Sequence, residues 1–182
     1  VSRTLSRSVS HRLGAPLAPS ARPRLHFGSW VGGDMDGNPY VTPQVFTEAL
    51  EKQRRVALRH LARATAELAP RLSHAAYRVP PTEALRESLE ADLEQFEATG
   101  GDVRKARKRL PREPYRLKVA MVALRLQRTA ERPLFAEEAA RPPLVYTHPD
   151  ELRADLALVR DALQAGGYAR AAGLGLADVE RM

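Results

Sequence analysis

The sequence predicts a mainly helical protein with one strand, and three observations lead to this fold class. Four segments of the 182-residue chain repeat apolar residues at helical spacing. One short segment, 24–31, alternates with a period of two, as a strand does. A stretch rich in glycine, aspartate, asparagine and proline follows it and is typical of turns. We therefore expect a basic arm or an incomplete preceding helix at 1–23, a strand and loop at 24–41, and a helical region at 42–182.

The N-terminal arm and the strand are distinguished by their patterns. Arginines stand among serine, proline and alanine in residues 1–23, and no acidic residue precedes Asp34, which is typical of a weakly ordered basic segment. In the run RLHFGSWV that starts at Arg24, Phe27 and Val31 lie on one side and Trp30 on the other. This alternation predicts a strand that ends at Gly32.

Each helical segment has recognisable start and stop signals. Proline after a threonine or histidine cap, paired prolines and paired glycines mark the ends of helices. These signals predict helices from Thr42-Pro43 to about Ala69, from Thr82 to Gly100-Gly101, from Pro114 to about Ala130, and from His148-Pro149 to Gly166-Gly167. The third helix is apolar around most of its circumference, so we expect it to be buried on several sides.

The chain has an excess of positive charge, which is typical of proteins that bind nucleic acid. Lysine and arginine total 29 against 22 acidic residues, which gives a net charge of +7 and a pI near 10.2. A basic helical module that binds nucleic acid is therefore the alternative to an enzyme. The most basic tract has no acidic residue and no interleaved aromatic, so a solvated loop between helices is favoured over a nucleic-acid patch. Its cations are Arg104, Lys105, Arg107, Lys108, Arg109 and Arg112.

Several other classes of site are excluded or disfavoured. The chain has no cysteine, which excludes disulfides, thiolate metal sites and a thiol nucleophile. No apolar run is long enough to span a membrane, so we expect a soluble, cytoplasmic protein. The histidines have no metal-ligand spacing and are interpreted as surface or helix-cap residues. They are His11, His26, His60, His74 and His148.

The segment 27–42, FGSWVGGDMDGNPYVT, is the strongest candidate for chemistry. It either presents carboxylates at the end of a strand, as active-site loops do, or forms a tight turn whose Asp34, Asp36 and Asn38 bond only their own backbone. A calcium loop is disfavoured because Pro39 and Val45 replace the required glycine and glutamate. Neither a phosphate-binding P-loop nor a serine nucleophile elbow has its required residues here.

Three segments resemble one enzyme family. The run FGSWVGGDMDGNPYVT resembles the FGSW-x-GGDRDGNP-x-VT signature of bacterial and plant-type phosphoenolpyruvate carboxylase. Downstream, EPYRLKVAMVALRLQRT from Glu113 and YTHPDELRADLALVRDAL from Tyr146 resemble two further segments of that family, in the same order. The resemblance covers most of the chain, and the family's complete enzyme is several times longer.

The resemblance implies a fold and a reaction. It implies a piece of an α/β barrel of the TIM type decorated with helices, in an enzyme that converts phosphoenolpyruvate and bicarbonate into oxaloacetate and phosphate with Mg²⁺ or Mn²⁺. It also implies a homo-oligomer, a tetramer when the protein is full length. From the residues themselves we expect no membrane binding, and nucleic-acid binding is disfavoured. The active-site loop that it implies consists of Gly32, Gly33, Asp34, Met35, Asp36, Gly37 and Asn38.

One position departs from the family signature. The family has arginine between the two aspartates, and this chain has Met35, which cannot donate a charge-assisted hydrogen bond. The catalytic lysine, the histidine motif and the metal-binding carboxylates of the family also have no counterpart in these residues. We therefore expect the 182-residue chain to be inactive alone, and a degenerate, non-catalytic carboxylase-like protein is a further alternative.

Overall fold

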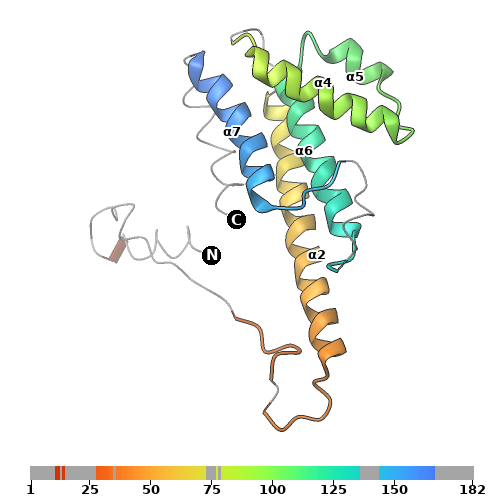
Figure 1. Ribbon diagram of the computed structural model, residues 1–182. Helices are drawn as coiled ribbons and strands as arrows, with labels where there is room; N and C mark the ends of the chain where they lie inside the picture. Colours follow the sequence, from red (N-terminus) through yellow and green to blue (C-terminus); the bar gives the residue numbers. More distant parts are fainter. Residues whose placement is uncertain are drawn as a thin grey trace. The chain divides into compact units, whose positions relative to one another are not determined.

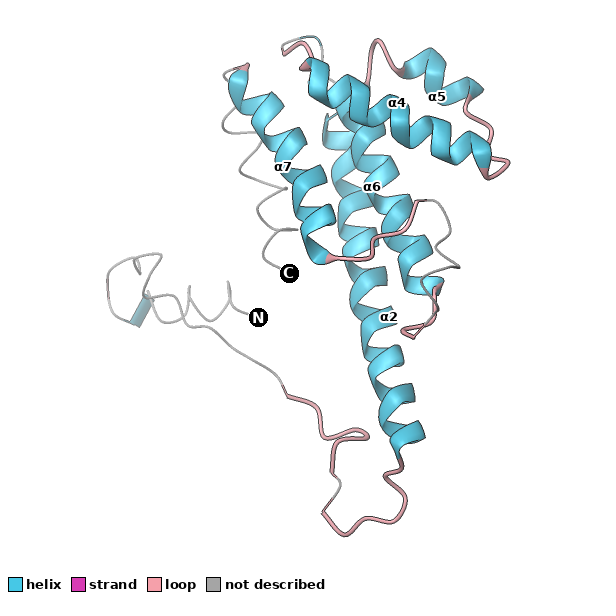
Figure 2. Ribbon diagram, in the orientation of Figure 1, coloured by secondary structure: helices cyan, strands magenta, loops and turns pink. Residues whose placement is uncertain are grey.

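The structure is a computed structural model that describes residues 11–12, 14, 28–34, 36–72, 77, 79–135 and 144–166. The described elements are helices joined by turns and loops (Figures 1 and 2). The chain divides into two compact units, Val1–Ala49 and Leu50–Met182. The long helix α2 begins in the first unit and continues through the start of the second.

The four predicted long helices are present with close to the expected bounds. They are α2 (Pro43–Leu68), α4 (Glu83–Ala98), α6 (Pro114–Glu131) and α7 (Pro149–Ala165). Thr42 and Thr82 cap α2 and α4, because their hydroxyl oxygens accept the amides of Val45 and Leu85, each at 3.3 Å. A single 3₁₀ turn, η2 (Ala69–Leu72), extends α2.

The predicted strand is wrong over the residues that can be judged. Residues 28–31 adopt coil and turn conformations, with the amide of Gly33 bonded to the carbonyl of Trp30 at 3.1 Å, and residues 24–27 lie outside the described part. Alternating side chains make a strand possible, but a strand forms only when its backbone groups pair with a neighbour. No second strand is present in the described ranges to provide that pairing. The mainly helical class is correct, whereas the expected strand is not found.

The basic tract also differs from its prediction. Residues Arg104–Arg109 form a short helix, α5, and not a loop. Val103 is the N-cap residue of this helix, and no side chain caps it. The preceding Asp102 accepts hydrogen bonds from the amide and the guanidinium of Arg104, each at 3.0 Å, so an acidic residue lies beside the N-terminus of the basic run, where a negative charge is favourable.

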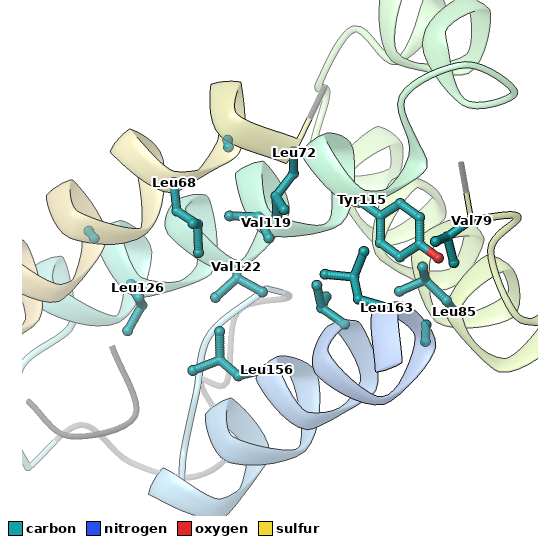
Figure 3. Close-up of a cluster of buried hydrophobic side chains, with 14 of the residues drawn as sticks. Leu68, Leu72, Val79, Leu85, Tyr115, Val119, Val122, Leu126, Leu156 and Leu163 are labelled. Carbon is teal, nitrogen blue, oxygen red and sulfur yellow. The ribbon is translucent and has the colours of Figure 1, made fainter. Parts of the chain in front are cut away.

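Helix α6 is the centre of the second unit. It contacts η2, α4, α5 and α7, so the apolar residues around its circumference are covered by other elements of this chain (Figure 1). The main core lies between α6, α7 and the end of α2, and Figure 3 shows the side chains converging there. Its members include Leu68, Leu72, Tyr115, Val119, Val122, Leu126, Leu156 and Leu163.

A second core lies on another side of α6. Leu89 and Leu93 of α4 pack there with Met121 and with Val103 and Leu144 from the connecting segments. The carbonyls at the end of α6 are bound by Arg54 of α2, whose two guanidinium nitrogens donate to the carbonyls of Thr129 and Arg132, each at 2.9 Å. The last turn of a helix leaves such carbonyls without partners, so Arg54 fastens α2 to α6.

Candidate functional site

We call residues 28–42 the signature loop. It consists of local turns: the carboxylate of Asp34 accepts the amide of Asp36 at 3.4 Å, and the side chain of Asn38 accepts the amide of Tyr40 at 3.0 Å. The backbone carbonyl of Asn38 accepts the amide of Val41 at 3.1 Å. These bonds are typical of aspartate and asparagine in turns. The local turns expected from these aspartate and asparagine residues are therefore formed.

One glycine seats the loop on the first turns of α2. Gly32 has φ of +70°, and a Cβ built on it would lie 2.8 Å from Cβ of Ala49 and 3.2 Å from the carbonyl oxygen of Val45. Both the backbone conformation and the close approach require glycine. Gly37 also has a positive φ, +73°, but open space surrounds it. Both positions therefore favour glycine by conformation, but only Gly32 is also packed against another part of the chain.

The polar groups of the signature loop face solvent. Asp34, Asp36 and Asn38 are exposed, and so are the aromatic side chains of Trp30 and Tyr40, with 81% and 83% of their surfaces accessible. Met35 lies outside the described residues. Asp36 and one carboxylate oxygen of Asp34 make no described side-chain bond, so these oxygens can accept hydrogen bonds from groups supplied by other parts of a larger protein.

The described residues do not fit a metal ion. No three side chains of histidine, aspartate or glutamate gather into a possible metal site within the described ranges. Asp34 and Asp36 alone offer too few ligands for Mg²⁺ or Mn²⁺. The histidines follow the surface-or-cap interpretation where they can be judged: His11 and His60 are exposed, and Nδ1 of His148 caps α7 by accepting the amide of Asp150 at 3.3 Å. His26 and His74 lie outside the described part.

The basic tract is partly neutralised by acidic neighbours. Arg104 forms a two-bond pair with Asp102, with both N–O distances 3.0 Å. Arg107 pairs with Glu90 at 2.9 Å and with Glu97 at 3.5 Å. These carboxylates compete with phosphates for the same guanidinium groups, so the tract is poorly suited to binding nucleic acid.

Sequence reasoning missed a group of buried charges, which we call the buried charge network. Its centre is Lys118 of α6, which is fully buried: Nζ donates to Asp92 at 2.6 Å and to Ser88 at 2.7 Å, and it forms an ion pair with Asp155 at 2.8 Å. Close polar partners of this kind offset the cost of burying an ammonium group. The network comprises Ser88, Asp92, Lys118, Arg125, Tyr146 and Asp155.

Arg125 and Tyr146 complete the network on the side of α7. Arg125 donates to Asp155 at 2.6 Å and stacks over the ring of Tyr146, 4.1 Å from its centre, while the Tyr146 hydroxyl donates to the same carboxylate at 2.7 Å. Burial and the Asp155 carboxylate raise the pKa of Tyr146, and burial raises the pKa of Asp92 despite the attraction of Lys118. The side chains of Lys118 and Asp92 are almost fully buried and those of Arg125 and Asp155 are 15% and 11% exposed, so the network joins α4, α6 and α7 largely out of solvent.

The sequence held a signal for this network. Lys118 and Arg125 are two cations seven residues apart, hence on one face of the helix, and the residues between them on that face are Met121 and Val122. Charges on such an apolar face need acidic partners on neighbouring helices.

Lys118 and Arg125 belong to the segment from Glu113, and their partners Tyr146 and Asp155 belong to the segment from Tyr146, whereas Ser88 and Asp92 lie on α4. Tyr115 from the segment at Glu113 is also buried and donates to the carbonyl of Pro80 at 3.3 Å. The downstream segments therefore contribute buried contacts, whereas the polar groups of the signature loop are exposed.

Comparisons with known proteins match one family over the whole chain. The family model for phosphoenolpyruvate carboxylase matches residues 1–182. Among curated relatives, the chain is 40% identical over 151 residues to phosphoenolpyruvate carboxylase of Nocardia farcinica, covering 81% of this chain and 15% of the relative. It is 37% identical to that of Xanthomonas campestris, over 89% of this chain and 16% of the relative.

The matches cover most of this chain but only a small part of each relative. A third relative, phosphoenolpyruvate carboxylase of Thermosynechococcus vestitus, is 33% identical over 92% of this chain and 17% of its own length. The chain thus spans about a sixth of the length of the relatives that it matches, and it aligns with them over most of its own residues. With its helices, its signature loop and these matches considered together, the chain is a segment that belongs to the phosphoenolpyruvate carboxylase family.

Proposed function

We propose that the protein to which this segment belongs is an enzyme that forms oxaloacetate and phosphate from phosphoenolpyruvate and bicarbonate, a carbon–carbon lyase acting in the cytoplasm. The observation that supports this most is the family match over residues 1–182. The proposal follows the family for the homotetrameric state and for the use of Mg²⁺ or Mn²⁺, whose ligands would come from residues other than those described. The ion's chemistry is to stabilise negative charge on the enolate and the phosphate.

The signature loop is proposed to border the active site through Gly32–Asn38. Its support is the exposed, turn-ordered backbone and the free carboxylate oxygens of Asp34 and Asp36. A site that holds phosphate and bicarbonate needs cationic donors, and carboxylates beside such donors fix their positions. In this proposal Asp34 and Asp36 orient cationic side chains from elsewhere in the protein. Gly32 allows the loop backbone to approach the first turns of α2 closely.

Met35 gives the loop one fewer anion-binding group than the family signature. The loop as it stands cannot donate to phosphate from this position, so other cations must carry the anion. If none does, the alternative of a carboxylase-like protein without catalysis applies. These two outcomes differ in a single observable, the turnover of phosphoenolpyruvate by the complete protein.

The test measures oxaloacetate formation by the complete protein with Mg²⁺ and bicarbonate, for the natural sequence and for Asp34→Asn. The amide keeps the acceptor oxygen that orders the turn at Asp36 and removes the charge. We expect turnover in the natural protein and a loss of about 10-fold or more in the variant, with the helical content unchanged. Glu87→Gln, on the exposed face of α4, is the matched control and should keep full activity.

Two results would contradict the proposal. Absence of turnover in the complete, folded protein would favour the non-catalytic alternative, and full activity of the Asp34→Asn variant would remove the signature loop from the site. The 182-residue chain alone is expected to show no turnover, since its described residues contain no metal site. Any turnover by that chain that Asp34→Ala abolishes would show that the segment is a complete catalytic unit.

A further inference from the structure

Two residues of α2 hold the place where the chain leaves α6. Arg54 donates to the carbonyls of Thr129 and Arg132, each at 2.9 Å. A carboxylate oxygen of Glu51 accepts the amide of Leu134 at 3.1 Å. Glu51 and Arg54 stand three residues apart, so they lie on one face of α2. We call these two residues the helix clamp, because together they bind the last carbonyls of α6 and the turn that follows it.

The helix clamp is closer in sequence to the signature loop than the apolar contacts of α2 with the main core. Within the described residues, the side chains of α2 that join this core begin at Leu58 and continue to Leu68. The residues of α2 before the clamp are mostly exposed, and the buried Ala49 among them lies against Gly32 of the signature loop. The clamp therefore holds α2 to α6 on the loop side of its hydrophobic contacts.

The length of helix between the clamp and the signature loop makes the direction of α2 important. Pro43 begins α2 and precedes Arg54 by eleven residues, which corresponds to about 16 Å of continuous helix. A tilt of about 4° at the clamp would therefore move the start of the helix by about 1 Å. A misplacement of about 1 Å that originates far from the reacting groups can cost an enzyme about 10²-fold in rate. Small changes at the clamp thus become significant at the loop.

The chemistry of Arg54 suits a contact that fixes a direction. A guanidinium is a planar fork of donors, so binding two carbonyls at once sets its orientation, which a single ammonium group does not achieve. Burial and the nearby charge of Arg132 lower the pKa of Arg54, whereas Glu51 acts in the opposite sense. Arg54 is therefore held beside a like charge, and the two carbonyl bonds together with Glu51 favour this position.

We propose that Glu51 and Arg54 are positioning residues of the active site, which act through α2 on the placement of the signature loop. For its effect on catalysis this inference rests on the proposed function. Neither residue touches substrate in this account. Their effect passes along α2 to its first turns, on which Gly32 seats the loop, and so to the carboxylate of Asp34.

Steady-state kinetics of the complete protein test the catalytic part of the inference. Arg54→Met removes both donors to α6 and should lower kcat/KM for phosphoenolpyruvate by about 10- to 100-fold. Arg54→Lys keeps the charge but not the fork, so its loss should be smaller. Arg55→Met, at the next and exposed position of α2, is the matched control and should keep full activity. The assays are run at a temperature at which circular dichroism shows every variant to be folded.

The acceptor side of the clamp has its own pair of variants. Glu51→Gln keeps an acceptor oxygen for the amide of Leu134 and should keep most of the activity. Glu51→Ala removes that acceptor, so kcat/KM should fall in the same direction as for Arg54→Met, by a smaller factor because one hydrogen bond is lost and not two.

A double-variant cycle distinguishes positioning of the loop from a general structural role. If the clamp acts through the loop, Arg54→Met disturbs the placement on which Asp34 depends. Adding Asp34→Asn to Arg54→Met should then lower kcat/KM by a smaller factor than Asp34→Asn does in the natural protein. Two unrelated effects would instead multiply, because changes at independent sites are additive in free energy.

Distances between spin labels test the role of the clamp without catalysis. Gln44→Cys on α2 and Glu87→Cys on α4 place labels at two exposed positions, and any other cysteine of the complete protein is replaced by serine. Pulsed electron paramagnetic resonance then measures the distribution of distances between the two labels. We expect one narrow distribution in the natural background and with Arg55→Met, and a shifted or clearly broader one with Arg54→Met.

The inference and the proposed function fail in different ways. An inactive natural protein would overturn the proposed function and the catalytic role of the clamp, while the label distances would still decide whether the clamp directs α2. An active natural protein whose Arg54→Met variant keeps full kcat/KM would overturn the inference and leave the proposed function in place. An unchanged distance distribution with Arg54→Met, or factors that multiply in the cycle with Asp34→Asn, would likewise overturn it.

Discussion

In the helical body, the described residues of 50–166, key charges are removed from water and paired, whereas in the signature loop they stay in water. The Lys118 ammonium is bound by side chains of α4 and α7: it donates to Ser88 and Asp92 and forms an ion pair with Asp155. The side-chain bonds described for the signature loop all reach backbone amides two or three residues away. The first arrangement fixes helices to one another, and the second leaves carboxylates available. A segment of a larger enzyme needs both.

The buried charge network should give the largest effect on stability. Lys118→Met leaves Asp92 and Asp155 buried with one cation fewer, which is expected to cost about 3–5 kcal/mol in the free energy of unfolding. Lys105→Met, an exposed lysine of α5, should cost less than about 0.5 kcal/mol. Urea unfolding followed by circular dichroism measures both. Equal losses in the two variants would mean that the network does not hold the helical body together.

Two glycines of the signature loop, Gly32 and Gly37, test the loop side of the comparison. Gly32→Ala meets both a positive φ and the Ala49 side chain, so it should displace the loop and lower kcat/KM of the complete protein on the order of 10²-fold. Gly37→Ala meets only the positive φ and should lower it less. Neither should shift the unfolding of the helical body by more than about 1 kcal/mol. A larger loss for Gly37→Ala would place the critical contact elsewhere in the loop.

The pH dependence of stability separates the two kinds of carboxylate. Burial raises the pKa of Asp92 above 3.8, so its carboxyl group binds a proton more tightly in the folded state than in the unfolded chain. The stabilisation is complete below pH 3.8 and is lost as the pH rises through the folded-state pKa. The free energy of unfolding of the natural chain minus that of Asp92→Asn should therefore fall as the pH rises from about 3.5 to 7. A difference that grows with pH would mean that attraction to Lys118 dominates.

Removing a charge from the signature loop should have the smallest effect on the stability of the fold. Asp34→Asn keeps the acceptor of the local turn and removes a charge that lies in water, so the free energy of unfolding should change by less than about 0.5 kcal/mol. Thermal unfolding of the 182-residue chain measures this. A loss above 1 kcal/mol would show that Asp34 is part of the folded framework and not a group kept free for a site.

The sequence predicted the helices well because their signals are local. Thr42, Thr82 and His148 cap where the pattern places them, and the bounds of α6 follow from Pro114. The strand at 24–31 was predicted wrongly because pairing with another strand is a property of the surrounding structure and not of the eight residues themselves. The buried charge network was missed for a similar reason: Lys118 and Asp92 are 26 residues apart, and only the packing of α4 on α6 brings them together.

The candidate site was predicted from its motif and not from its geometry. The turns at Asp34 and Asn38 agree with the residue types. The packing of Gly32 on Ala49 could not be predicted from the sequence. The basic tract illustrates the opposite case, because its composition suggested a loop, whereas Arg104–Arg109 form a short helix with Asp102 bound to Arg104 beside its N-terminus. Residue type thus predicts the local turn, and tertiary contacts decide what the turn is fixed to.

The most direct test of the central claim, that the signature loop serves an anion-binding active site, is kcat/KM of the complete protein for phosphoenolpyruvate with and without Met35→Arg. Arginine restores a charge-assisted donor to the loop, and one such donor is worth about 2–4 kcal/mol, or on the order of 10² to 10³ in rate. We predict a large increase in kcat/KM under identical metal and bicarbonate, with the stability of the helical body unchanged. A strongly active natural protein that gains nothing from arginine would contradict the account, because position 35 would then not face the anions.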